Sequence, residues 1–170
     1  MTPTSPTVRI PGVRYHIRWM IRRDLDEVLA IESASDARPF TENELLSLLR
    51  ERNVIGMVAE HGERVVGFMI YELHKDRLAL RKLAVAPDVR RRGVGRQLVN
   101  KLVNKLNAHA RQRIDLIVRD SHVAGHLFLR SMGFIATGVE RGAFDDTGED
   151  GYHFSYRLDV ATVVTDGVCS

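Results

Sequence analysis

Residues 83–95 read LAVAPDVRRRGVG, and this stretch decides the fold. The apolar segment Leu83-Ala84-Val85 is strand-like, three arginines follow it, and a long amphipathic helix pattern begins at Val94. Gly93 and Gly95 allow the backbone to approach a bulky anion closely, the free N–H groups of a first helical turn point at such an anion, and arginines neutralise it. The junction therefore predicts a phosphate cradle, most simply for a pyrophosphate.

The strength of such a cradle depends on the number of N–H groups that converge on the anion. A single charge near a helix N-terminus gains about 0.3–1 kcal/mol, whereas each hydrogen bond to a charged group adds roughly 1.5–3 kcal/mol. The arginines alone would therefore not suffice. The alternative is a solvated basic turn before an ordinary helix, and the flanking strand and helix favour the cradle over it.

The composition predicts one domain. The chain has 170 residues, of which 44% are apolar, and a net charge of +3. We expect a flexible leader at 1–12, the domain at 13–160 and a flexible tail at 161–170. The only cysteine is Cys169, so there is no disulfide framework and no thiol cluster for a metal. No apolar run resembles a signal core or spans a bilayer, which predicts a cytoplasmic protein without a membrane partner.

The charge distribution argues against a nucleic-acid partner. Charged residues of both signs are spread along the chain, and only 6% of the residues are aromatic. Proteins that bind single-stranded nucleic acids interleave aromatic with basic residues. A local anionic ligand therefore explains the arginines better than a nucleic acid does.

Hydrophobic periodicity and turn signals give the order of the elements. We expect two helices that begin with capping boxes, Asp24 with Glu27 and Thr41 with Glu44. The expected elements are a strand at 14–21, a helix from Asp24, a helix from Thr41, strands at 54–59, 65–71 and 78–85, a helix from Val94 to Leu106, a strand at 114–118, a helix capped by Ser121 that ends at Gly133, a strand from Phe134, a loop at 145–150 and a strand at 152–158.

The strand at 78–85 changes phase along its length. Leu78 and Leu80 share one face, but Leu83 and Val85 have the opposite parity, as if one residue had been inserted. This pattern predicts a β-bulge, which would splay the strand so that unpaired backbone groups can bind a ligand. The alternative is a buried strand whose apolar run is irregular.

The order of these motifs resembles a known family. LAV-x-P followed by RRRGVG, a long helix, a strand and LFLRSMGF at 127–134 resembles the GNAT superfamily of acetyl-CoA-dependent N-acetyltransferases, over about 14–158. ARPFTENEL at 37–45 and GEDGYHFSYRL at 148–158 resemble the branch that acetylates protein N-termini, including the ribosomal-protein-alanine N-acetyltransferases. The resemblance implies a single α/β (α+β) domain with a mixed, mostly antiparallel sheet of six to seven strands and about four helices.

The resemblance also implies the ligand contacts. Acetyl-CoA would open the sheet between its fourth and fifth strands, and backbone groups of Leu83, Ala84 and Val85 would pair with its pantetheine arm. An N–H near Val85 would polarise the thioester oxygen. No metal is implied, and the acceptor would be the N-terminus of a peptide or protein such as a ribosomal protein. The residues expected to hold the pyrophosphate are Arg90, Arg91, Arg92, Gly93, Val94, Gly95 and Arg96.

The sequence departs from the family at the positions expected to carry the chemistry. His122 stands where the family has a pantetheine-binding asparagine, and Leu129 stands where it has the tyrosine that protonates the leaving thiolate. Ile117 replaces the strand glutamate or histidine that serves as base. His122 is one candidate for the acid and a cofactor contact, or it only orients the cofactor or meets water. Tyr152 is the second candidate for the acid.

A site without a strong base favours α-amines. At pH 7.4 about a quarter of an ordinary α-amine is neutral, compared with about a thousandth of a lysine amine. This argument supports an N-terminal acceptor independently of the resemblance. Water chains that end on Glu72 or His74 would weaken it, because they would supply a base.

Other functions remain open at this point. The spacing of His122 and His126 can hold zinc, but no metalloprotease carboxylate or nearby cysteine completes a site, so we expect a cap residue and a packing residue. A non-catalytic acyl-CoA-binding module would explain the missing tyrosine. An acetyltransferase for small amines, such as polyamines, amino acids or antibiotics, would close its pocket with the loops at 33–41 and 143–152.

Overall fold

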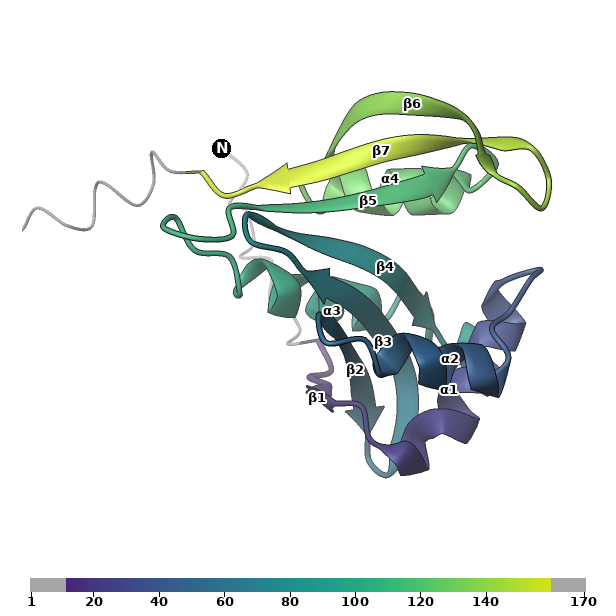
Figure 1. Cartoon of the computed structure of the whole chain (residues 1–170). Helices are drawn as coiled ribbons and strands as arrows, with labels where there is room; N and C mark the ends of the chain where they lie inside the picture. The colour runs from purple at the N-terminus through teal and green to yellow at the C-terminus, as the bar shows by residue number, and fades with distance from the viewer. Residues whose placement is uncertain (1–11, 160–170) are drawn as a thin grey trace, which may run out of the picture.

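The computed structural model describes residues 12–159, in which seven strands form one open sheet (Figure 1). The sheet has the order β1-β2-β3-β4-β5-β7-β6. The strands are β1 (His16–Trp19), β2 (Val54–His61), β3 (Arg64–Leu73), β4 (Arg77–Val85), β5 (Arg113–Arg119), β6 (Ile135–Phe144) and β7 (Glu149–Arg157). The helices are α1 (Leu25–Ser35), α2 (Glu42–Leu49), α3 (Val94–Val103) and α4 (Val123–Ser131), with short 3₁₀ turns at Arg22–Asp24 and Pro87–Val89. The predicted fold class is confirmed.

The sheet opens between β4 and β5. These two strands are the parallel pair, and their register covers only Arg77–Ala79 of β4 against Arg113–Asp115 of β5. Beyond that point the strands diverge, and Figure 1 shows β5, β7 and β6 lifting away from β1 to β4. All other neighbouring strands are antiparallel. The sheet is therefore mixed, and it is open between its fourth and fifth strands as expected.

The predicted bulge in β4 is present. Ile70 of β3 pairs with Lys82, and the next residue, Tyr71, pairs with Leu80. Arg81 is therefore the extra residue, and it explains the change of phase between the two halves of the strand. The bulge lies where β4 leaves β5, so the bend and the opening occur together.

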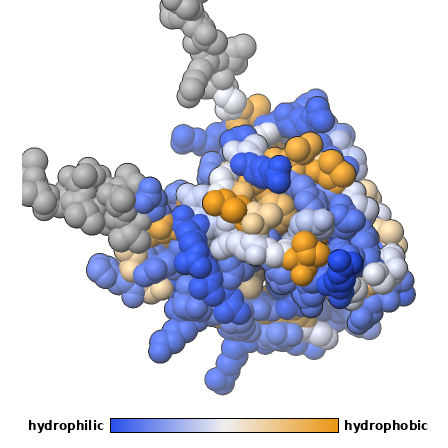
Figure 2. Space-filling model, turned by 90° about the horizontal axis from the view of Figure 1, so that it is seen from above, coloured by the Kyte–Doolittle hydropathy of each residue, from blue (hydrophilic) through white to orange (hydrophobic). Residues whose placement is uncertain are grey.

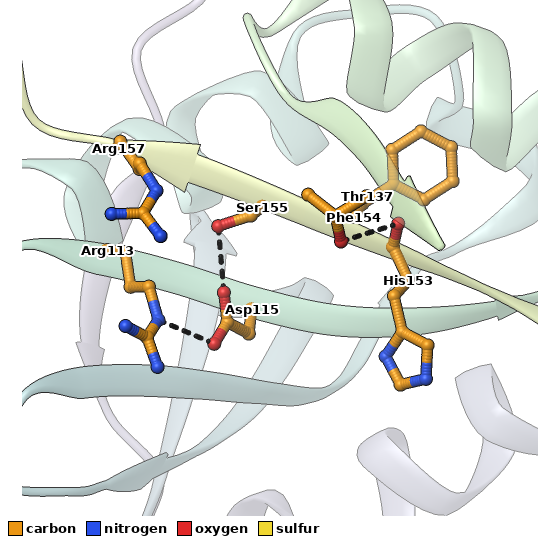
Figure 3. A pocket seen from close by; sticks show the side chains of 7 residues that line it. All are labelled: Arg113, Asp115, Thr137, His153, Phe154, Ser155 and Arg157. Atoms are coloured by element: carbon orange, nitrogen blue, oxygen red, sulfur yellow. Dashed lines mark hydrogen bonds and ion pairs between the residues drawn. The ribbon is translucent and has the colours of Figure 1, made fainter. Parts of the chain in front are cut away.

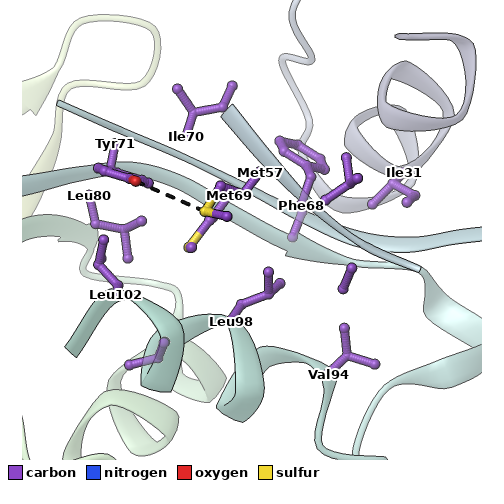
Figure 4. Packing of buried hydrophobic residues seen from close by; sticks show 14 of the residues in the cluster. Ile31, Met57, Phe68, Met69, Ile70, Tyr71, Leu80, Val94, Leu98 and Leu102 are labelled. Atoms are coloured by element: carbon purple, nitrogen blue, oxygen red, sulfur yellow. Dashed lines mark hydrogen bonds between the residues drawn. The ribbon is translucent and has the colours of Figure 1, made fainter. Parts of the chain in front are cut away.

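The core consists of apolar side chains on both faces of β3. Figure 4 shows Leu98 and Leu102 of α3 on one side of the strand and Ile31 of α1 on the other. Leu98 and Leu102 have no exposed surface. The face that carries α1 and α2 is called the acceptor face below, and the face that carries α3 and α4 is called the helix-pair face.

One of the two expected capping boxes forms. The Thr41 side chain accepts from the Glu44 N–H at 3.2 Å, and the Glu44 carboxylate accepts from the Thr41 N–H at 2.8 Å. The prediction of a capping box at Asp24 is wrong. Asp24 is buried and bonds instead to the Arg18 guanidinium, at 2.7 and 2.9 Å, because an unpaired buried carboxylate would be costly.

Several ends of elements also differ from the expectations. Helix α3 ends at Val103, before Leu106, and β7 begins at Glu149, inside the expected loop. The N-cap position of α4 is His122 and not Ser121, whose N–H donates to Glu149 at 2.6 Å. Gly133 ends the α4 segment as expected, with a φ of +90°. The expected leader at 1–12 and the expected tail at 161–170 lie almost wholly outside the described residues.

The surface is largely hydrophilic, with separate apolar patches. Figure 2 shows such patches on the side where β6 and β7 lie in Figure 1. Apolar residues of α4 and β6 are well exposed, Leu127 at 63% and Ile135 at 70%. Among residues 12–159, none of the helices is long and apolar enough to cross a membrane.

Candidate active site

The open edge of β4 presents backbone groups to the gap. The Ala86 N–H donates to the Val66 carbonyl of β3 at 2.8 Å. Because antiparallel partners alternate, Ala84 also directs its backbone groups toward β3, where it pairs with Phe68. Leu83 and Val85 then direct theirs toward the gap. Of the three residues expected to pair with pantetheine, Leu83 and Val85 are therefore the two whose N–H groups face the gap, and the Val85 carbonyl already accepts from the Arg90 guanidinium.

The first turn of α3 lies where the sequence predicts a phosphate cradle. Gly93 occupies the N-cap position with a φ of +88°, and its carbonyl accepts the first intrahelical bond, from the Gln97 N–H at 3.0 Å. The N–H groups of Val94, Gly95 and Arg96 therefore lack helical acceptors. No acidic side chain lies in this turn. These donors and the absence of acid fit a phosphate group.

Gly95 lies where α3, α4 and β4 meet. A Cβ atom there would lie 3.4 Å from Phe128 Cζ and 3.8 Å from Val85 Cγ2. Both are ordinary contact distances, so a methyl group fits at Gly95, whereas a longer side chain would need space beyond Phe128 and Val85.

The arginines of the motif have different surroundings. Arg91, Arg92 and Arg96 are exposed, and none of them makes an ion pair with another residue of 12–159. Arg90 donates instead through Nε to the Val85 carbonyl and through Nη2 to the Ser35 hydroxyl, each at 3.2 Å. The structure thus leaves three arginines available for a phosphate and uses the fourth to join the ends of β4 and α1.

His122 and Tyr152, the two candidate acids, have different surroundings. His122 is exposed, and its ring folds over Gly125, where a Cβ atom would lie 2.5 Å from the His122 Cδ2 atom. Tyr152 is half-buried against His126, with ring centroids 5.1 Å apart. His126 Nε2 lies 2.9 Å from the Arg119 carbonyl, and the His126 ring also packs edge-on against Phe154, with centroids 5.2 Å apart. The roles of His122 and Tyr152 as acids stay predictions.

Leu129 and Ile117, which stand where the family has its tyrosine and its strand base, differ in burial. Leu129 is 3% exposed and belongs to the core. Ile117 is 36% exposed on the acceptor face and covers Gly151, where a Cβ atom would lie 2.4 Å from Ile117 Cδ1. In the described part of the chain, no three His, Cys, Asp or Glu side chains gather as metal ligands.

A charged cluster on the acceptor face escaped the sequence analysis. Lys82 Nζ lies 2.8 Å from Glu32 Oε1 and 2.5 Å from Asp36 Oδ2, and 5.1 Å from the centre of the Phe40 ring. Glu32 is fully buried. Burial is the largest single influence and raises the pKa of Asp36, but the hydrogen bonds from Lys82 and the Arg38 N–H, together with the charges of Lys82 and Arg119, outweigh it, so the pKa lies below its ordinary value. The cluster joins residues distant in sequence, so no local pattern indicates it.

A second charged cluster, centred on Arg119, joins the end of β5 to the turn between β6 and β7. The Arg119 guanidinium bonds both carboxylate oxygens of Asp146, at 2.9 and 2.7 Å, and lies 4.1 Å from the centre of the Phe144 ring. The charge of Arg119 also contributes to the lowered pKa of Asp36. The ends of β5 and α1 are therefore within electrostatic reach of each other, with the turn between β6 and β7 held beside them.

Glu72, one of the two proposed ends of a water chain, is already engaged. Its Oε2 atom lies 2.8 Å from His74 Nε2, and its Oε1 atom pairs with Arg81. Glu72 pairs in register with Ala79, and Ala79 still pairs with β5. Glu72 and His74 therefore belong to the closed end of the gap.

An open sheet edge beside a helix N-terminus with free N–H groups and exposed arginines fits a ligand that joins an extended polar arm to a phosphate group, as coenzyme A does. The acetyltransferase (GNAT) family model matches residues 15–134, and the chain belongs to this family. It is therefore an acyltransferase of the N-acetyltransferase type, in a family that uses acetyl-CoA as its donor.

Two curated relatives and one solved structure are similar to the chain. The [ribosomal protein bS18]-alanine N-acetyltransferase of Escherichia coli K12 is 29% identical over 124 residues, which cover 73% of this chain and 83% of that protein. The mycothiol acetyltransferase of Nocardia farcinica is 34% identical over 103 residues, 56% of this chain and 34% of that protein. The crystal structure of the Escherichia coli ribosomal-protein-S18-alanine enzyme superposes with a TM-score of 0.76 at 24% identity, covering 86% and 96% of the two chains, and shows the shared fold.

Gly95→Glu should abolish acetyl-CoA binding while the chain stays folded. The added carboxylate would enter the cradle with the same charge as the phosphates, whereas an acidic residue in the first turn favours the helix itself. Isothermal titration with acetyl-CoA measures the effect, with Gly138→Glu as control because nothing lies within 4 Å of Gly138. Gly93→Glu should also abolish binding but should lose stability, since its φ is positive. Unchanged affinity in Gly95→Glu would refute the site.

Asp146→Asn should loosen the turn between β6 and β7. Hydrogen bonding from Arg119 lowers the pKa of Asp146, so the ion pair is complete at neutral pH and is lost as the pH falls below the ordinary carboxyl range through the lowered value. Hydrogen exchange of residues 144–149 at pH 7 should be faster in this variant and unchanged in Asp145→Asn. Equal exchange in the two variants would show that the ion pair does not hold the turn.

Proposed function

We propose that the chain transfers acetyl from acetyl-CoA to the α-amine of a protein N-terminus, with a ribosomal protein as the expected acceptor. The observation that carries the proposal is the 29% identity to the [ribosomal protein bS18]-alanine N-acetyltransferase over 83% of that enzyme's length. The similarity thus extends through most of the relative, beyond the cofactor-binding half. The cytoplasm, where ribosomal proteins are made, is the compartment in which the proposal places the enzyme.

The acceptor face supports an α-amine. Ile117 occupies the β5 position where the family has a base, so this position offers no carboxylate or imidazole to the acceptor. An α-amine at neutral pH is neutral roughly 200 times more often than a lysine amine, so it needs far less help with deprotonation. The acceptor would enter between the Lys82 cluster and the Arg119 cluster.

The donor half supplies binding and polarisation. When acetyl-CoA is bound, its thioester supplies the acetyl group, and the first-turn N–H groups of α3 with Arg91, Arg92 and Arg96 would hold the pyrophosphate. The Val85 N–H, which points to the gap, would stabilise negative charge on the carbonyl oxygen. His122 and Tyr152 stay candidates for protonating the thiolate.

A small-molecule amine is the second candidate acceptor. The mycothiol acetyltransferase, whose name specifies a small-molecule acceptor, matches at 34% identity but over only 56% of this chain and 34% of that protein. This match is the observation that favours a small acceptor. A non-catalytic acyl-CoA-binding module is a third candidate, and it rests on Leu129 in place of the family's tyrosine.

An acetylation assay separates these functions. The pure protein is incubated with isotopically labelled acetyl-CoA and three acceptors: a peptide with a free N-terminal alanine and no lysine, its N-terminally blocked counterpart with one lysine, and a mixture of polyamines and amino sugars. Mass spectrometry locates the label. We expect label on the free α-amine, at a rate roughly 100-fold or more above that on lysine.

The other outcomes are equally specific. Label on the small amines alone would move the function to the second candidate. Acetyl-CoA binding by calorimetry without label on any acceptor, including the proteins of a desalted lysate, would indicate the non-catalytic module.

A further inference from the structure

The structure brings a histidine next to the position where the family's base is missing. His153 of β7 is the register partner of Ile117 of β5. Register partners in an antiparallel pair point to the same face, with Cβ atoms about 4.5–5.5 Å apart. His153 therefore stands on the acceptor face, one strand further from the gap than Ile117.

We propose that His153, held by Glu140, is the general base that takes the proton from the acceptor's ammonium group. The proposal deepens the proposed function and rests on it, because it assumes an amine acceptor on this face. His153 would be a catalytic residue that contacts the acceptor directly or through one water, and Glu140 would be a positioning residue.

The contact between the two side chains leaves one ring nitrogen available. His153 Nε2 lies 3.0 Å from Glu140 Oε2. An ionised carboxylate only accepts hydrogen bonds, so a neutral His153 donates from Nε2 and keeps the lone pair on Nδ1. The side chains are 47% and 56% exposed, so an acceptor can reach them. This histidine–carboxylate arrangement is the one that orients a base for proton transfer.

His153 is the available base in its pocket, because the other charged groups there are either already hydrogen-bonded or have no basic lone pair. Figure 3 shows the His153 side chain leaving β7 and crossing in front of β5, in a pocket of about 250 Å³. Asp115 in this pocket already accepts from Ser155 Oγ at 2.8 Å and from Arg113 Nε at 2.9 Å. Arg157 also lines the pocket and carries no basic lone pair.

The position along the strands also favours His153 over Glu72 and His74. Asp115 is level with Ala79, the last residue of β4 that still pairs with β5. Ile117 and His153 lie two residues further along, which is about 7 Å into the opening. Glu72 and His74 lie at or before the closed end, and Glu72 already pairs with Arg81. His153 is therefore level with the open part of the gap.

The proposed step balances without a further reactant. The proton passes from the acceptor ammonium to His153 Nδ1 and leaves a lone pair on the amine nitrogen. That nitrogen forms the new C–N bond with the acetyl carbonyl carbon, the C–S bond of the thioester breaks, and the thiolate leaves with the electron pair of that bond. The thiolate takes a proton from the candidate acid, His122 or Tyr152, which solvent reprotonates, and His153 returns its proton to solvent.

The test is the pH dependence of kcat/KM for the amine that the wild type acetylates. His153→Gln should lower kcat/KM roughly 100-fold at pH 7, and the loss should shrink toward pH 9, where an α-amine is neutral without a base. Glu140→Gln should lower it less. His16→Gln, on the exposed edge strand β1, is the control and should match the wild type. Free imidazole should raise the rate of His153→Ala and leave that of the wild type unchanged.

The results that would overturn the role of His153 differ from those that would contradict the proposed function. A loss by the same factor at every pH, without rescue by imidazole, would show a structural role and overturn the proposal, as would a wild-type profile in His153→Gln. Failure of the wild type to acetylate any peptide would contradict the proposed function instead, and the comparison would then be made on the small amine that carries the label.

Discussion

The short pairing of β4 with β5 is the constraint on which the site depends. Three residues of each strand remain in register, and the Arg81 bulge bends β4 away from its neighbour. The open edge leaves the Leu83 backbone groups and the Val85 N–H without a strand partner, while the Val85 carbonyl accepts from Arg90, and unpaired backbone groups are costly when water is excluded. A ligand that lies along this edge satisfies them, so the gap is at once a cost to the fold and the reason that it binds.

Much of the fold was predictable because short-range patterns in the sequence indicate its strands, helices and turns. The bulge left a change of parity between Leu80 and Leu83, and the Thr41 box left two polar residues at a fixed spacing. The Asp24 box failed although its spacing was equally good. Arg18, six residues earlier, binds the Asp24 carboxylate in the folded chain, and the Glu27 carboxylate accepts from the Val65 N–H at 2.8 Å, so neither member of the box is free to form it.

The site was predictable on its donor side and not on its acceptor side. The cradle consists of consecutive residues around Gly93 and Gly95, so a motif indicates it. The acceptor side is assembled from side chains that only the sheet brings together, such as Lys82 with Glu32 and His153 with Glu140. Charged residues on strands and helices look alike in sequence whether they are solvated or paired, so spacing carries no signal for these contacts.

Residue-resolved hydrogen exchange of β4, with and without acetyl-CoA, tests the central claim most directly. The Leu83 and Val85 amides face the gap and should exchange much more slowly once the donor is bound, together with the first-turn amides of α3. The Ala84 amide, which faces β3, should change little. Unchanged exchange at Leu83 and Val85 under saturating acetyl-CoA would contradict the account, because the donor would then lie elsewhere.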